Sequence, residues 1–106
     1  MPAIGTLHQQ LCTAIGERRL LAFSSKHCHR IAEPHDYGVK DGVRRLLYYQ
    51  VGGRSNSDPP TGWRWAETDE ITGMQLLEER FAGPRPAETG RHLKWDKLFA
   101  SVYQKG

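Results

Sequence analysis

Residues 43–69, VRRLLYYQVGGRSNSDPPTGWRWAETD, set the fold that the sequence predicts. The segment begins and ends with strand-like runs of aromatic and branched residues, joined by a connection made almost wholly of turn-forming residues. The connection, 52–62, has no apolar side chain apart from its prolines, so we expect it to be exposed. Because two strands alone are unstable in water, we expect the remaining chain to cover them.

The first strand-like run, 43–51, carries apolar residues on both faces. Its odd positions are the more apolar set, interrupted only by Arg45. Its even positions include Leu46 and Tyr48 together with Gln50. Such a strand is typical of a small, strongly bent sheet, in which each strand meets both the core and covering elements.

Two amphipathic helices are predicted, one toward each end of the sequence. Thr6 is a candidate N-cap for the first, and apolar residues follow it at spacings of three and four as far as Ile15. In the second, apolar and aromatic residues recur at the same spacing from about Leu93 to Gln104. We expect this second helix to cover an open end of the sheet with its aromatic side.

Between the first helix and the central segment, residues 20–24 and 28–32 have the length and composition of strands. Pro34 cannot donate to a strand ladder, so we expect the second strand to end there and an irregular stretch to follow. Asp41 and Gly42 then form a strong turn signal directly before the central segment.

Residues 71–77 follow the central segment and fit either a helix or a strand, because periodicity over so few residues does not decide between them. We expect a strand with a bulge at Gly73, since Thr72-Gly73 is poor helix material. Phe81 is expected in the core. Indole rings supply much of the burial in a small domain, so the three tryptophans are expected there too. They are Trp63, Trp65 and Trp95.

The composition, with 38% hydrophobic and 25% charged residues among 106, is that of one ordinary globular domain spanning 1–106. The net charge of +3 is spread over several segments, unlike the single basic face of a dedicated nucleic-acid binder. The chain has no apolar run of transmembrane length, no signal-peptide pattern and no CxxC spacing. We therefore expect a cytoplasmic protein that does not associate with a membrane.

No catalytic pattern stands out from the sequence. The serines lie in no nucleophile-elbow motif, and the glycines form no phosphate-binding loop. His27, Cys28, His29 and His35 suggest zinc, but adjacent strand residues point to opposite faces and no second cysteine pair completes a ligand set. We expect no metal, no cofactor and no enzymatic activity.

Several of these segments occur together, in this order, in one known family. They are HRIAEP at 29–34, the strand after the Asp-Gly turn, WRW at 63–65, Glu70-Ile71 and Phe81. Over about residues 20–82 the sequence resembles the WYL domain, a bacterial module named for a Trp-Tyr-Leu run at the start of its central strand. That triplet is itself replaced here by residues of the run Arg44-Arg45-Leu46-Leu47.

The resemblance implies a mostly β fold, a small Sm-like bent barrel of five antiparallel strands, here with an N-terminal and a C-terminal helix. WYL domains usually follow a helix-turn-helix domain in transcriptional regulators, where they are thought to sense a nucleotide or nucleic acid. The resemblance therefore implies a non-enzymatic, ligand-sensing module with a regulatory role. The alternative is a protein–protein interaction module that works with a separately encoded partner or as a homodimer.

Four residues are predicted to bind an anionic ligand, such as a nucleotide or nucleic acid: Arg30, Tyr48, Arg64 and Arg45. Guanidinium groups hold phosphate or carboxylate with paired hydrogen bonds, and an aromatic face stacks on a base. The resemblance matches Arg64 to an arginine of the family's later strand and Arg30 to the basic residue before Glu-Pro. In the alternative, these arginines pair with acidic neighbours and only border the sheet. Those neighbours are Glu33, Glu67 and Asp69.

Overall fold

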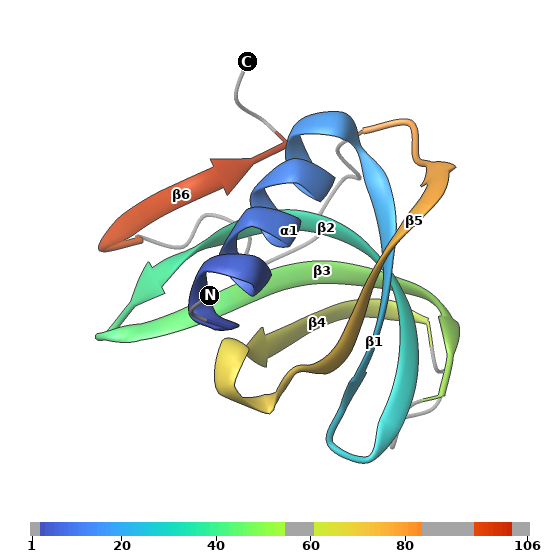
Figure 1. Cartoon of the computed structure of the whole chain (residues 1–106), viewed down its shortest axis with the longest axis horizontal. Helices are drawn as coiled ribbons and strands as arrows, with labels where there is room; N and C mark the ends of the chain where they lie inside the picture. The colour runs from blue at the N-terminus through green and yellow to red at the C-terminus, as the bar shows by residue number, and fades with distance from the viewer. Residues whose placement is uncertain (1–2, 55–60, 84–94, 103–106) are drawn as a thin grey trace.

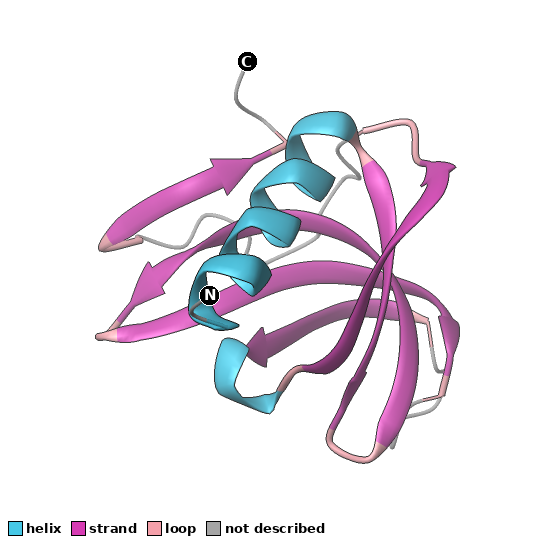
Figure 2. Ribbon diagram, in the orientation of Figure 1, coloured by secondary structure: helices cyan, strands magenta, loops and turns pink. Residues whose placement is uncertain are grey.

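The computed structural model describes residues 3–54, 61–83 and 95–102. Helix α1, six strands and one short 3-10 helix, η1, follow one another along these residues (Figures 1 and 2). Their bounds are α1 Ala3–Glu17, β1 Arg19–Ser25, β2 Cys28–Lys40, β3 Val43–Gly53, β4 Gly62–Glu67, η1 Thr68–Glu70, β5 Thr72–Arg80 and β6 Lys97–Ser101. The N-terminal helix and the strands expected on either side of the central connection are confirmed, but α1 begins at Ala3, so Thr6 lies inside the helix and is not its N-cap.

All six strands belong to one antiparallel sheet, ordered β4-β3-β2-β1-β5, with β6 paired to β2. The long strand β2 is its axis. It pairs with β3 from Arg30 to Lys40, with β1 over residues 28–32, and with β6 over residues 36–39. Figure 1 shows the sheet curling strongly, with α1 lying across it between β6 and β1. The expected mostly β fold with an antiparallel sheet is therefore confirmed.

The sheet is not closed, because no ladder joins β4 to β5 among the described strands. The expected five-stranded barrel is thus not confirmed, and the sheet has six strands within the described residues. The open edges lie along β4 and β5, on either side of η1.

The expected C-terminal helix over 93–104 is wrong where the structure describes it, since residues 97–101 form β6. Residues 93, 94, 103 and 104 lie outside the described part of the chain. The physical reason lies in β2. Strand β1 stops pairing with β2 at Ala32, which leaves the edge of β2 open beyond that point, and β6 pairs with it there. An unfilled row of backbone donors and acceptors outweighs the helical spacing of a short apolar segment.

The expectation that Pro34 ends its strand is also wrong, because β2 runs through it to Lys40. Pro34 lies after the last pair with β1 and before the first pair with β6, so on that side no ladder requires its missing N–H. A register shift between Pro34 and Asp36 marks a bulge at His35. The bulge bends β2 and lets one strand serve both halves of the sheet.

The core lies between α1 and the concave side of the curled sheet. Leu11 and Ile15 of α1 pack in one cluster with Phe23, Tyr37 and Tyr48. This places the even positions Leu46, Tyr48 and Gln50 of β3 on the core side, although the odd positions are the more apolar set. The polar Gln50 lies on the buried side, which its side-chain hydrogen bonds permit.

The tryptophans do not form the core that the sequence predicts. Trp65 is 37% exposed, and Trp63 and Trp95 are half-buried. Trp65 and Trp95 lie with ring centroids 5.6 Å apart, and Trp63 packs edge-on to His35 at 4.7 Å. The face of β3 and β4 that points away from the core carries Trp63 and Trp65, and its aromatic surface is thus only partly covered.

The turns follow the local sequence closely. Asp41 and Gly42 both have positive φ angles, 54° and 77°, as the expected turn requires. Gly73 has a φ of 63° at a register shift between β1 and β5, which confirms the expected bulge. Lys26 and His27 also have positive φ angles, 51° and 65°, although neither is glycine.

Candidate functional site

Two predicted site residues, Arg30 and Arg64, converge on one side chain. Nη1 of Arg30 donates to Oε1 of Gln50 at 2.8 Å, and Nε of Arg64 donates to the same oxygen at 3.4 Å. The amide nitrogen of Gln50 donates to the backbone carbonyls of Gly52 and Arg54, at 2.9 and 2.8 Å. These four bonds use both ends of the amide and fix its orientation.

Tyr48 completes this group, which we call the arginine cluster: Arg30, Tyr48, Gln50 and Arg64. Tyr48 and Arg64 are directly opposite each other on β3 and β4. The Arg30 guanidinium hydrogen-bonds the Tyr48 hydroxyl. Burial raises the pKa of Tyr48 above its usual value of 10.0, although the charges of Arg30 and Arg64 act in the opposite direction. The structure therefore brings three of the four predicted residues together.

Arg45 is not part of the arginine cluster. Arg45 and Tyr48 are three residues apart on β3, which pairs with β4 without a register shift, so their side chains point to opposite faces of the sheet. On its own face, Arg45 lies directly across from Glu67 of β4. Its Nε is buried and has no hydrogen-bond partner among the described residues. An anion held by the cluster would therefore not contact Arg45.

Arg30 is buried, with only 4% of its surface exposed. In the described part of the chain it forms no ion pair with a carboxylate. Its acceptors there are neutral: the Ser25 carbonyl at 3.2 Å, the Gln50 amide and the Tyr48 hydroxyl. The expected alternative, an ion pair with Glu33, is not seen for Arg30. Because neutral oxygens do not offset the charge of a guanidinium, Arg30 creates a local site of positive potential.

The arginine cluster is closed in this conformation. Tyr48 is only 1% exposed, and its ring packs edge-on to Phe23 with centroids 5.2 Å apart, so it cannot stack on a base without movement. Arg64 is half-buried and is the member nearest to solvent. Further basic side chains are exposed on the adjoining turns, and the Arg54 amide donates to the His29 carbonyl at 2.7 Å. These exposed residues are Lys26, His27, His29 and Arg54.

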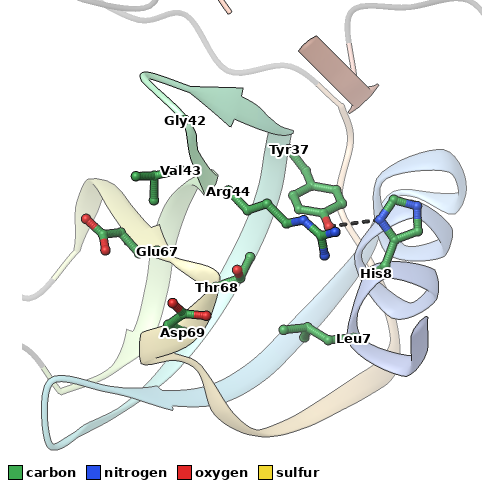
Figure 3. A pocket seen from close by; sticks show the side chains of 9 residues that line it. All are labelled: Leu7, His8, Tyr37, Gly42, Val43, Arg44, Glu67, Thr68 and Asp69. Carbon is green, nitrogen blue, oxygen red and sulfur yellow. Dashed lines mark hydrogen bonds between the residues drawn. The ribbon is translucent and has the colours of Figure 1, made fainter. Parts of the chain in front are cut away.

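A pocket of about 500 Å³ lies at the other end of β2, where the β2–β3 turn approaches α1 and η1 (Figure 3). We call it the turn pocket. Its lining residues are Leu7, His8, Tyr37, Gly42, Val43, Arg44, Glu67, Thr68 and Asp69. Sequence reasoning missed it because its walls come from segments far apart in the chain. The acidic run at 67–70 was the one local signal that pointed toward it.

A hydrogen-bonded chain links the turn pocket to the helix. The Tyr37 hydroxyl lies 2.9 Å from Nδ1 of His8 and also accepts a hydrogen bond from Arg44. Because a guanidinium only donates, the Tyr37 hydrogen is available to His8. Nε2 of His8 lies 3.8 Å from the sulfur of Cys12. Burial raises the pKa of Cys12, so this thiol lacks the low pKa of an activated nucleophile.

Within residues 3–54, 61–83 and 95–102, no group of three His, Cys, Asp or Glu side chains could hold a metal ion. Among the described helices, none combines the length and the hydropathy needed to cross a membrane.

Comparisons with family models, curated proteins and solved structures gave no match to this chain. The resemblance to the WYL domain therefore stays a prediction from the sequence.

Proposed function

We propose that this protein is a non-enzymatic, WYL-like binding module that recognises an anionic ligand, a nucleotide or nucleic acid, through the arginine cluster. The observation that carries the proposal is the buried Arg30 guanidinium, held by neutral acceptors beside a second guanidinium. The strongly curled antiparallel sheet supports the proposal, although no ladder among the described strands closes it into the Sm-like barrel that the resemblance implies. A cytoplasmic, regulatory role is part of the proposal, and the two free cysteines agree with it.

The exposure of the basic side chains indicates the order in which an anion would contact them on its way to the arginine cluster. An anion would first meet the basic side chains of the adjoining turns, and then Arg64. Phosphate oxygens could next replace the shared Gln50 oxygen as acceptor for both guanidinium groups, since charged acceptors form stronger bonds than an amide does. Stacking on Tyr48 would require that its ring leave Phe23.

Thermal shift with nucleotides and short labelled oligonucleotides, followed by fluorescence anisotropy, tests this function. Binding should weaken steeply as salt is raised, because phosphate contacts release counterions. Arg64→Ala should lower affinity by about tenfold or more, the usual cost of losing a charge-assisted contact. Arg80→Ala removes an equal charge from the exposed end of β5 and should leave affinity nearly unchanged. Equal binding by wild type and Arg64→Ala would refute the proposal.

A protein-interaction module is the second candidate. It is favoured by the partly uncovered face that carries Trp65 and Leu98, which are 37% and 36% exposed. Large apolar side chains at the surface are enriched where proteins bind one another. Sedimentation velocity over a range of concentrations distinguishes a homodimer from a monomer, and Trp65→Ser should abolish self-association if this face mediates it.

A further inference from the structure

The turn pocket carries opposite charges on facing walls without an ion pair between them. Figure 3 shows Arg44 extending toward Tyr37 and His8 on the helix side, while Glu67 and Asp69 lie on the η1 side. Among the described residues, no ion pair joins Arg44 to either carboxylate. Arg44 instead donates to the Tyr37 hydroxyl and lies over the Phe99 ring, 6.0 Å from its centroid.

These contacts hold Arg44 away from the acids and leave space between the charges. The hydrogen bond to Tyr37 uses one of the five N–H donors of the guanidinium, so a fork of donors remains for a carboxylate. On the opposite wall, the Thr68 hydroxyl and the Asp69 carboxylate supply the acceptors that an ammonium group needs. Leu7 and Val43 add apolar surface to the lining of the pocket.

We propose that the turn pocket binds a small zwitterion of the amino acid class. The ligand carboxylate contacts Arg44, and its ammonium group contacts Asp69 and Thr68. The volume of about 500 Å³ lies within the usual range for small-molecule sites and exceeds the needs of a single inorganic ion. Asp69 and Glu67 both line the pocket, so its carboxylates outnumber its one guanidinium, and a basic amino acid fits its charge better than an acidic one.

This site is separate from the arginine cluster, at the opposite end of β2, and does not depend on the proposed function. Arg44 lies on β3 beside the Asp41-Gly42 turn, whereas Arg30 lies beside the Lys26-His27 turn. Nucleotide binding and amino acid binding can therefore succeed or fail independently.

Isothermal titration calorimetry with free L-amino acids tests the proposal directly. Free lysine or arginine should bind, and their Nα-acetyl and carboxamide derivatives, each lacking one charge of the zwitterion, should bind about tenfold more weakly or worse. Equal binding of either derivative would overturn the proposal. So would the absence of heat from every free amino acid at a concentration of about 10 mM, since a weaker site would be worth less than about 3 kcal/mol.

Variants then locate the site. Arg44→Gln and Asp69→Asn should each lower affinity by about tenfold, because each removes one end of the charge pairing. Both residues are exposed, so the fold should survive, as circular dichroism would confirm. Arg80→Gln and Glu78→Gln make the same changes on β5 and should bind as the wild type does. Arg64→Ala should also keep its affinity, and unchanged binding by Arg44→Gln would overturn the assignment.

Discussion

Each end of β2 has an arginine near a hairpin turn, but the two arginines differ in burial and in the groups around them. At the Lys26-His27 end, Arg30 is buried among neutral oxygens in a closed cluster. At the Asp41-Gly42 end, Arg44 is exposed and borders an open pocket that Asp69 and Glu67 also line. The closed end therefore contributes its polar contacts to stability, while the open end leaves its charges available.

The largest expected effect is at Gln50, the centre of the closed end. Gln50→Leu removes the acceptor of two guanidinium groups and the donor of two carbonyls, so it should lower the free energy of unfolding by about 3 kcal/mol or more. Arg44→Gln at the open end removes one hydrogen bond to Tyr37 and a contact with the Phe99 ring, and should lower it by only about 1 kcal/mol. Urea denaturation monitored by tryptophan fluorescence measures both.

Gln50→Glu sharpens the same comparison. A carboxylate at this position can pair with both guanidinium groups, so it should cost less stability than leucine does. It should also abolish anion binding, because the positive potential is then neutralised internally. A leucine variant as stable as the wild type would mean that the arginine cluster makes no net contribution to folding.

The next effect compares the two buried tyrosines, Tyr48 at the closed end and Tyr37 at the open end. Replacing either by phenylalanine removes a hydrogen-bonded hydroxyl and should cost about 1 kcal/mol near neutral pH. Burial raises the pKa of both tyrosines above 10.0. Below that pH the hydroxyl is protonated in the folded and unfolded states, and above it the unfolded chain ionises first. Stability should therefore fall as pH rises above about 10.

The two Tyr→Phe variants distinguish the contribution of Tyr48 from that of Tyr37 to this loss of stability at high pH. Tyr48→Phe and Tyr37→Phe should each flatten the fall in melting temperature above about pH 10, and the double variant should flatten it most. An alkaline transition unchanged in the double variant would assign it to other groups.

Much of the fold could be predicted because its signals are local. The Asp41-Gly42 turn, the bulge at Gly73 and the strand-like runs on either side of the 52–62 connection each depend on a few neighbouring residues. What failed depends on the tertiary arrangement. The helical spacing near Phe99 was overridden by a free edge of β2 that no local pattern reveals.

The candidate sites divide in the same way. The family resemblance pointed to Arg30 and Arg64, and the curled sheet brings them to one oxygen of Gln50. Arg45 was grouped with them only by sequence position, and strand parity places it on the other face. The turn pocket could not be predicted, since Arg44 and Asp69 meet only after α1, the β2–β3 turn and η1 have packed.

The smallest expected effect concerns the two turns themselves. His27 adopts a φ of 65°, a conformation that glycine reaches without the steric cost of a β-carbon, whereas the Asp41-Gly42 turn already has glycine at the matching position. His27→Gly should therefore raise the free energy of unfolding by about 0.5 to 1 kcal/mol, and Gly42→Ala should lower it by a similar amount. Thermal and urea denaturation measure both. His27 lines a second pocket together with Glu70 and Thr72, so a destabilised glycine variant would mean that the imidazole stabilises the fold there by more than the backbone strain costs. A stabilised variant that binds anions more weakly would instead mean that this turn tolerates strain because its imidazole serves the ligand.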